Sequence, residues 1–207
     1  MKSIIFDVDG TLLSTESMYI TALSETLKAH QIERSEAELH HVFGLPGPES
    51  LTYLKIPEPA MILADWVARL DDFRDSIFLY PEIFTMLEQL QKAQYKMGIV
   101  TSNTPAEFAA HQDRFEIEQF FTDFVFAGMT PQMKPAADPI LLAMSNLVSD
   151  PKQTIYIGDS IHDMKAAHNA GVAFGMAGWG VLDRTVFENE ADYIFESPND
   201  VVKWARR

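Results

Sequence analysis

The stretch Ile4-Ile5-Phe6-Asp7-Val8-Asp9-Gly10-Thr11 begins as a short apolar run and ends directly in two carboxylates. Side chains alternate between the two faces of a strand, so Asp7 and Asp9 are expected on the same side. In open α/β sheets, ligands bind outside the carboxyl ends of the strands. Two like charges there are unfavourable unless a cation, a shared proton or solvent relieves them, and Mg²⁺ suits all-oxygen ligands. Taken alone, the Asp-x-Asp-Gly pattern is better explained by a helix N-cap or a solvated turn.

The same pattern of a short apolar run followed by turn residues recurs along the chain. The intervening stretches place apolar residues at helical spacing. Alternation of strand and helix predicts an α/β fold, a Rossmann-like parallel sheet with helices on both faces. The expected strands are residues 3–6, 97–100, 124–126, 154–157, 172–176 and 193–195, and the expected buried helix faces include Ile83, Met86, Leu87, Leu90, Ile140, Leu141, Met144 and Leu147.

The long separation between the first strand and the next predicts an inserted small helical cap domain. Helical spacing continues through most of this stretch, with a Gly- and Pro-rich break at residues 44–48. We therefore expect residues 1–13 and 80–207 to form the α/β catalytic core and residues 14–79 to form the cap. One large core that includes these helices is the alternative. The apolar stripes expected inside the cap are Met18, Ala22, Leu23 and Leu27, and Met61, Leu63, Ala64, Val67 and Leu70.

Composition restricts the classes of function. The 207 residues are 47% hydrophobic, which is enough for a core, and no run of about 18 apolar residues predicts a membrane span. A formal net charge of −14 argues against nucleic acid and against anionic membranes as partners. The absence of cysteine excludes disulfides, thiolate metal sites and cysteine nucleophiles. We expect a soluble, cytoplasmic protein.

Three further segments place polar side chains after apolar runs. Thr101 and Ser102 end one predicted strand and precede a helix start, where free N–H groups can bind an anion. Asp159 and Asp163 follow another, one helical turn apart. Lys134 precedes a proline and, if turned inward, can neutralise a phosphoryl oxygen. Taken singly, each has a plain explanation as a cap, a first-turn acid or a surface lysine.

Other residues favour structural roles. The spacings of His40, His41, His162 and His168 match no metal-ligand pair, so these side chains are expected at the surface or partly buried. Trp179, between two glycines, is expected to pack over the edge of the sheet rather than to stack on a substrate.

The order of the four polar segments resembles the haloacid dehalogenase superfamily over nearly the whole chain. Residues 159–172 are similar to the phosphoglycolate phosphatase and β-phosphoglucomutase branch, whose members carry a helical cap after the first motif. The resemblance implies Asp7 as nucleophile and Asp9 as general acid and base. It also implies Thr101 and the Ser102 amide as phosphoryl ligands, and Lys134 as a charge-balancing catalytic residue. Mg²⁺ would be held by the Asp7 carboxylate, the Asp9 main-chain carbonyl, Asp159 and Asp163.

The implied activity is Mg²⁺-dependent hydrolysis of a small phosphate monoester, with 2-phosphoglycolate as the leading substrate. A sugar phosphomutase of the β-phosphoglucomutase type is the alternative, and a non-catalytic binding protein is the weakest reading. A dehalogenase is disfavoured because halide departure needs no acid at Asp9. Ser14 stands where relatives often carry Asp, at the expected hinge to the cap, and cap residues 43–49 are expected to contact the leaving group. We expect a small phosphorylated metabolite as partner, a monomer or weak homodimer, and an inward Lys134 with a cis bond to Pro135.

Overall fold

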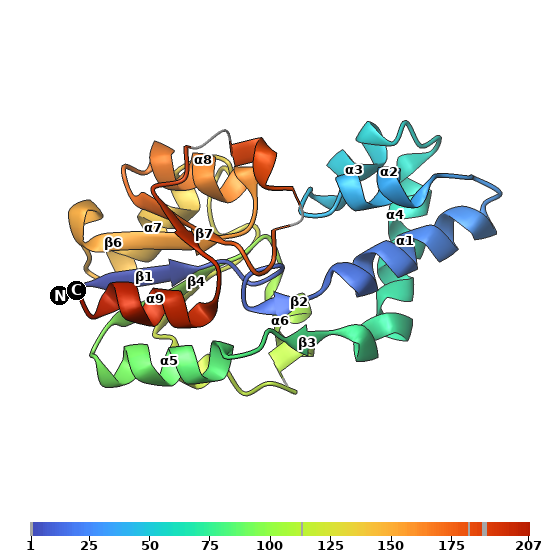
Figure 1. Ribbon diagram of the computed structural model, residues 1–207. Coiled ribbons are helices and arrows are strands. Elements are labelled where there is room, and N and C mark those ends of the chain that lie inside the picture. The colour runs from blue at the N-terminus through green and yellow to red at the C-terminus, as the bar shows by residue number, and fades with distance from the viewer. Residues whose placement is uncertain (1, 113, 182, 188–189) are drawn as a thin grey trace. The chain divides into compact units, whose positions relative to one another are not determined.

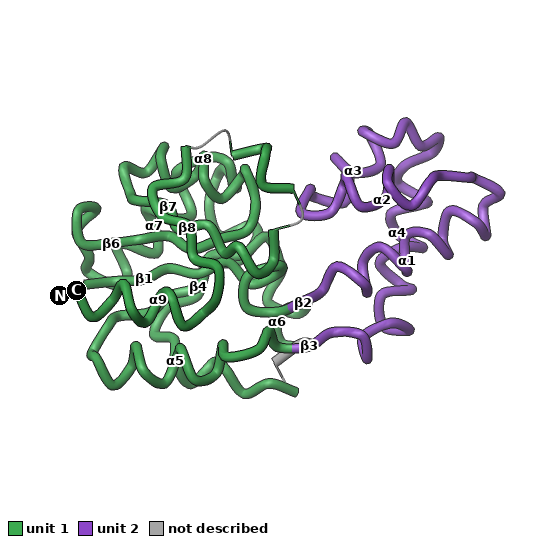
Figure 2. The backbone as a smooth tube through the Cα atoms, in the orientation of Figure 1, with its two compact units in different colours: residues 1–13, 79–207 green, residues 14–78 purple. Residues whose placement is uncertain are grey.

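The computed structural model describes residues 2–112, 114–181, 183–187 and 190–207, and Figure 1 shows their helices and strands. The chain divides into two compact units, residues 1–13 with 79–207 and residues 14–78 (Figure 2). It leaves the first unit through β2 (Leu13–Ser14) and returns through β3 (Phe78–Leu79), which pair with each other. The second boundary lies one residue before the position expected from the sequence. That the second unit acts as a cap stays a prediction.

The first unit contains a six-stranded parallel sheet in the order β5-β4-β1-β6-β7-β8. β1 (Ser3–Phe6) lies between β4 and β6, which flank it in parallel register. The α/β class and the parallel sheet predicted from the sequence are confirmed, because all six expected strands form within a residue or two of their expected ends. The remaining strands are β4 (Lys96–Val100), β5 (Asp123–Val125), β6 (Thr154–Gly158), β7 (Ala173–Ala177) and β8 (Tyr193–Phe195).

Helices cover both faces of this sheet (Figure 1). α7 (Asp138–Asn146) and α8 (Ile161–Asn169) pack on one face, and α5 (Ile83–Lys92) and α9 (Pro198–Ala205) pack together on the other. Beneath α7 and α8 lies a core that includes Ile5, Val100, Tyr156 and Met144. The unit also contains α6 (Pro105–Gln112) and three short 3₁₀ helices, η2 (Glu118–Phe120), η3 (Pro151–Gln153) and η4 (Arg184–Phe187).

One expected face of α7 is partly wrong. Ile140, Met144 and Leu147 are buried as the helical spacing predicts, but Leu141 is 47% exposed. The buried stripe follows positions three and four apart, and Leu141, next to Ile140, lies about 100° round the helix from it.

The second unit is helical, with α1 (Glu16–Ala29), α2 (Glu36–His41), α3 (Gly47–Tyr53), α4 (Pro59–Arg69) and η1 (Leu70–Ser76). The expected stripe of α1 is confirmed, since its four residues are all buried. The expected stripe of α4 is partly wrong, because Met61 and Val67 are about half exposed while Ile62 and Trp66 enter the core of this unit. Leu63 and Leu70 pack against that core, as expected. Ile62 and Trp66 lie four residues apart and therefore on one face. In the described parts of both units, no helix has the length and apolar character needed to cross a bilayer.

Candidate active site

The carboxyl ends of three neighbouring strands bring the predicted polar residues to one edge of the sheet. Ile5 and Phe6 of β1 lie opposite Gly98 and Ile99 of β4 on one side, and opposite Tyr156 and Ile157 of β6 on the other. The Asp7 N–H still donates to the Ile157 carbonyl over 2.9 Å, so the main chain at Asp7 is fixed by the sheet. Asp7, Thr101 and Asp159 therefore start from the same edge, because parallel strands end together.

Lys134 connects two of these carboxylates. Its Nζ atom donates to Asp7 Oδ1 over 2.8 Å and to Asp163 Oδ1 over 2.7 Å, and its side chain is only 6% exposed. The expected inward direction of Lys134 is confirmed, and the Lys134–Pro135 peptide bond is cis, as expected. A buried ammonium needs such partners, because an isolated charge away from water is strongly unfavourable.

Asp163 lies in the first turn of α8, and hydrogen bonds at the start of this helix fix its side chain. Ser160 and Asp163 form a capping box at the start of α8, in which Asp163 Oδ2 accepts from the Ser160 N–H (3.0 Å) and hydroxyl (2.6 Å). Gly158 makes room for this arrangement, since a Cβ there would lie 2.6 Å from the Cβ of Asp163. Asp163 Oδ1 accepts from Lys134 and lies 3.1 Å from the Tyr156 hydroxyl, so both oxygens of this carboxylate have polar partners within the protein.

Asp159 lies against the turn that follows β1. Thr11, fully buried, donates its hydroxyl to Asp159 Oδ1 over 3.2 Å. Gly10 has a φ of 75°, and a Cβ on it would lie 2.0 Å from Asp159 Oδ2. Two features therefore disfavour any residue other than glycine at position 10: the positive φ, and the clash of a Cβ atom with the Asp159 carboxylate. The turn and the carboxylate are fitted to each other.

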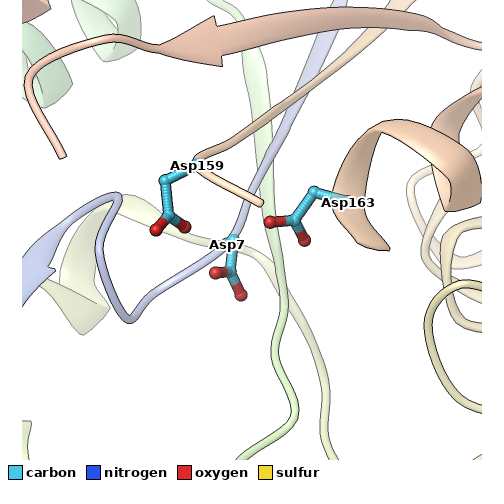
Figure 3. Close-up of side chains that lie close together, drawn as sticks. All are labelled: Asp7, Asp159 and Asp163. Carbon is cyan, nitrogen blue, oxygen red and sulfur yellow. The ribbon is translucent and has the colours of Figure 1, made fainter. Parts of the chain in front are cut away.

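Figure 3 shows the side chains of Asp7, Asp159 and Asp163 close together, where the segments that follow β1 and β6 meet the first turn of α8. One carboxylate oxygen from each lies within 4.8 Å of the others. Among the described residues, this is the group that could hold a metal ion. Three carboxylates and one ammonium leave an excess of negative charge, and the donors are all oxygen, so the residues fit a hard divalent cation such as Mg²⁺.

The electrostatics of the site show the same excess charge. Burial raises the pKa of Asp7 to about 7, against the lowering effect of Lys134, and the neighbouring carboxylates add to the rise. Burial and then Asp163 also raise the pKa of Asp159 well above its usual range. For Asp163 the effect of burial is outweighed by Lys134 and by hydrogen bonds from Ser160, which hold its pKa below the usual range. The pKa of Lys134 lies well above its usual range, because Asp163 and Asp7 outweigh its burial.

The remaining predicted residues lie at the same edge but outside the carboxylate cluster. Thr101 is fully buried, and its hydroxyl accepts a hydrogen bond from the Asn103 N–H over 3.1 Å, whereas Ser102 is exposed. Asp9, partly buried, belongs to the turn after β1, and its carboxylate is not one of the three clustered groups. Its expected metal contact through the main-chain carbonyl stays a prediction, as do the phosphoryl-binding roles of Thr101 and Ser102.

Sequence reasoning missed Tyr156, which lies beneath the cluster. Its hydroxyl is 3.0 Å from the Val100 carbonyl and 3.1 Å from Asp163 Oδ1, and it accepts from Lys134 Nζ over 3.3 Å. It therefore links the end of β4 to the Lys134–Asp163 pair, and burial raises its pKa well above the usual range, so it stays protonated. The only signal in the sequence is one hydroxyl-bearing aromatic among the isoleucines of β6.

A single substitution tests the charge balance of the cluster. Lys134→Met should destabilise the fold by about 3–5 kcal/mol in chelator near neutral pH, because it leaves buried carboxylates without their cation. The pKa of Lys134 is raised, so its charge is present throughout the neutral range, and the depressed pKa of Asp163 means that their stabilisation is lost as the pH falls. The deficit measured by urea unfolding should therefore shrink toward acidic pH. Exposed Lys152→Met is the matched control, and an equal deficit in both variants would contradict the prediction.

Comparison with known proteins places the chain in a family. The family model described as haloacid dehalogenase-like hydrolase matches residues 4–177. The chain is 25% identical over 206 residues to the pyrophosphatase PpaX of Oceanobacillus iheyensis, covering 98% of this chain and 95% of that protein. It is 28% identical over 207 residues to the PpaX of Bacillus velezensis, with the same coverage.

Solved structures agree in fold. A candidate phosphoglycolate phosphatase from Lactobacillus plantarum aligns with a TM-score of 0.90 and 29% identity, covering 98% of both chains. A candidate β-phosphoglucomutase from Thermotoga maritima aligns with a TM-score of 0.79 over all of this chain and 99% of that one, but at 21% identity the likeness concerns the fold alone. The family match spans most of the sequence and includes all four polar segments. The chain therefore belongs to the family of haloacid dehalogenase-like hydrolases.

Proposed function

We propose that this hydrolase is a Mg²⁺-dependent phosphatase that cleaves a small phosphate monoester through phosphorylation of Asp7. One observation carries the proposal: a buried carboxylate at a strand end is hydrogen-bonded to a buried lysine within a cluster of further carboxylates. A nucleophile must be aligned with the phosphorus atom that it attacks. Asp7 meets this requirement, because a backbone hydrogen bond and the contact with Lys134 fix its position.

In the first step, an Asp7 carboxylate oxygen would form a bond to phosphorus while the bond from phosphorus to the leaving oxygen breaks. Asp9 would give its proton to the departing alkoxide, so that the alcohol leaves neutral. In the second step, Asp9 would take a proton from water, whose oxygen attacks phosphorus. The bond to Asp7 then breaks, which releases phosphate and restores the carboxylate. Thr101, the Ser102 amide and Lys134 would bind and neutralise the transferring group.

The residues that would hold Mg²⁺ differ in their freedom to do so. Asp7 and Asp159 have raised pKa values, as expected for buried carboxylates whose negative charge is not fully balanced by neighbouring cations. Asp163 already accepts hydrogen bonds from Lys134 and from the Ser160 N–H and hydroxyl, and lies beside the Tyr156 hydroxyl, which favours a role through water or through Lys134 over direct ligation. The Asp9 carbonyl would be a further ligand. When bound, the ion would polarise the phosphoryl oxygens and offset the charge on Asp7.

Two substrate classes follow from different observations. The structural likeness at 29% identity to a candidate phosphoglycolate phosphatase favours a small carboxylated phosphate ester such as 2-phosphoglycolate. The relatives named pyrophosphatase favour inorganic pyrophosphate. A panel of phosphate monoesters and pyrophosphate, assayed with purified protein and Mg²⁺, separates them by kcat/KM. Absence of phosphate release from every compound, including a nitrophenyl phosphate, would contradict the proposed phosphatase activity.

We propose further that residues 14–78 supply substrate specificity through residues 43–49, a loop that runs into the first turn of α3 at Gly47. This loop is held from within its own unit, since the buried Ser50 hydroxyl lies 3.2–3.3 Å from the carbonyls of Val42, Leu45 and Pro46. Gly44, with a φ of 85°, makes the bend. A loop held in this way can present a defined surface to a leaving group, and binding energy remote from phosphorus can align the reacting groups.

Substitutions in this loop should change discrimination between esters more than they change hydrolysis of an activated aryl phosphate. Leu45→Ala and Glu49→Gln, measured on the best panel substrate and on nitrophenyl phosphate, should lower kcat/KM for the first by about 10-fold more than for the second, the equivalent of about 1.4 kcal/mol. Glu33→Gln, exposed on the same unit, is the control. Equal losses on both substrates would show that the loop supports the fold or the chemistry and not specificity.

A further inference from the structure

The loop of Gly178, Trp179 and Gly180, which follows β7, lies against the turn that carries Asp9. Trp179 Nε1 donates to the Thr11 carbonyl over 2.8 Å. At Gly180, a Cβ atom would lie 1.7 Å from the Gly10 carbonyl oxygen, so the two backbones meet directly. The expectation that Trp179 merely packs over the sheet edge therefore misses a specific contact, because this loop donates a hydrogen bond to the Thr11 carbonyl and its backbone abuts the Gly10 carbonyl.

The turn itself is narrow and is held from a second side. The Val8 carbonyl accepts from the N–H groups of Thr11 (3.2 Å), Leu12 (2.8 Å) and Leu13 (2.9 Å), which closes the chain into a tight bend. On the other side, the Asp159 carboxylate lies against Gly10 and accepts from the Thr11 hydroxyl. The peptide groups that follow Asp9 are thus held between Asp159 and the loop of residues 178–180.

That loop is well supported by the edge of the sheet. The Gly178 N–H donates to the Phe195 carbonyl over 2.8 Å, and the Gly180 N–H donates to the Ala177 carbonyl over 2.9 Å. Arg184 donates to the Gly178 carbonyl over 3.1 Å and also pairs with Glu196. These contacts anchor the loop to β7 and β8. The loop can therefore limit movement of the turn that follows β1.

We infer that Trp179, with Gly180, is a positioning residue for Asp9 in proton transfer to the leaving group. The inference rests on the proposed function and deepens it. Asp7 is held independently, by the sheet through Ile157 and by Lys134, so loosening the turn affects Asp9 more than the nucleophile. Proton transfer requires a donor within hydrogen-bond reach of the leaving oxygen, and small misplacements of such a group are costly.

The dependence of rate on the leaving group isolates this role. Nitrophenolate leaves readily without a proton, whereas phenolate and alkoxides need one, so Asp9→Asn should lower kcat/KM for phenyl phosphate by about 10²–10⁴-fold and for nitrophenyl phosphate much less. Trp179→Phe removes the N–H and keeps an aromatic ring. It should lower kcat/KM about 10-fold on phenyl phosphate and less than about 3-fold on nitrophenyl phosphate, in the same direction as Asp9→Asn.

Two further variants complete the comparison. Gly180→Ala, which forces the loop away from Gly10, should show the same selectivity with a larger loss, and it carries the test if Trp179→Phe fails to fold. Trp204→Phe is the matched control, since this ring packs on Tyr193 and Phe195 and should leave selectivity unchanged.

Equal losses on both phenyl esters, or no loss, in a Trp179→Phe protein with unchanged thermal unfolding would overturn the inference. Failure of the proposed function is distinguishable, because it would appear in the unaltered protein as no phosphate release. A lack of leaving-group dependence in Asp9→Asn would overturn the acid role of Asp9 and this inference together. The inference is supported if Trp179→Phe and Gly180→Ala lose more kcat/KM on phenyl phosphate than on nitrophenyl phosphate, while Trp204→Phe keeps the ratio of the unaltered protein.

Discussion

Asp7→Asn is expected to abolish turnover, with a loss of kcat of about 10⁴ to 10⁶-fold on every substrate. An amide oxygen is a poor nucleophile toward phosphorus, and no other described side chain occupies the place of Asp7 beside Lys134. Leaving-group ability should make no difference to this loss, in contrast to Asp9→Asn. The measurement is steady-state phosphate release, together with acid-quench detection of a phosphorylated protein, which the substituted chain should not form. Residual activity above about 1% of the original would contradict Asp7 as the nucleophile.

The same variant should be more stable than the unaltered protein in chelator. Burial raises the pKa of Asp7 from an ordinary value of 3.8 to about 7 in the folded protein. At pH values above about 7, the negative charge on Asp7 therefore destabilises the folded state relative to the unfolded state. A raised acid pKa makes the free energy of unfolding fall as the pH rises from about 4 to about 7, and Asn removes this component. We expect a gain of roughly 2 to 4 kcal/mol at pH 8 that disappears toward pH 4, measured by urea unfolding. A loss of stability at pH 8 would contradict the assigned charge balance.

Removal of the metal is expected to have the second largest effect. A chelator should reduce kcat by about 10³-fold or more, since electrostatic stabilisation by a bound ion is worth several kcal/mol, and excess Mg²⁺ should restore it. The carboxylates of Asp7, Asp159 and Asp163 converge with one lysine to balance them. Undiminished activity in excess chelator would contradict the metal assignment.

A readout without catalysis tests the same site. At a concentration of Mg²⁺ about 100 times its dissociation constant, the free energy of unfolding should rise by about 2.7 kcal/mol. Asp159→Asn should lose most of this rise, because its carboxylate is the least balanced of the three, with a pKa that burial and Asp163 raise well above the usual range. Asp72→Asn, an exposed carboxylate of the second unit, is the control and should keep it. An equal rise in both variants would place the ion elsewhere.

The sequence determined the class of the fold and the edge of the sheet that carries the candidate site, for a local physical reason. The alternation of short apolar runs with helical stretches predicts parallel strands covered on both faces, and strands that run together end together, so Asp7, Thr101 and Asp159 share an edge. Gly10 and the spacing of Asp159 and Asp163 added the turn and the first helical turn. The order of these segments then gave the family resemblance, which the family match confirms.

Only the tertiary structure decided what these residues contact. Helical spacing left the face of α4 open, and packing chose Ile62 and Trp66 over Met61 and Val67. The link from Tyr156 to Lys134 and Asp163, and the contact of Trp179 with Thr11, join segments that lie 22 and 168 residues apart in sequence. No local periodicity encodes such pairs, because they depend on how loops from different strands meet above the sheet. The pKa values of the carboxylates also depend on these tertiary contacts, since burial and Lys134 act on Asp7 and Asp163 only in the folded chain.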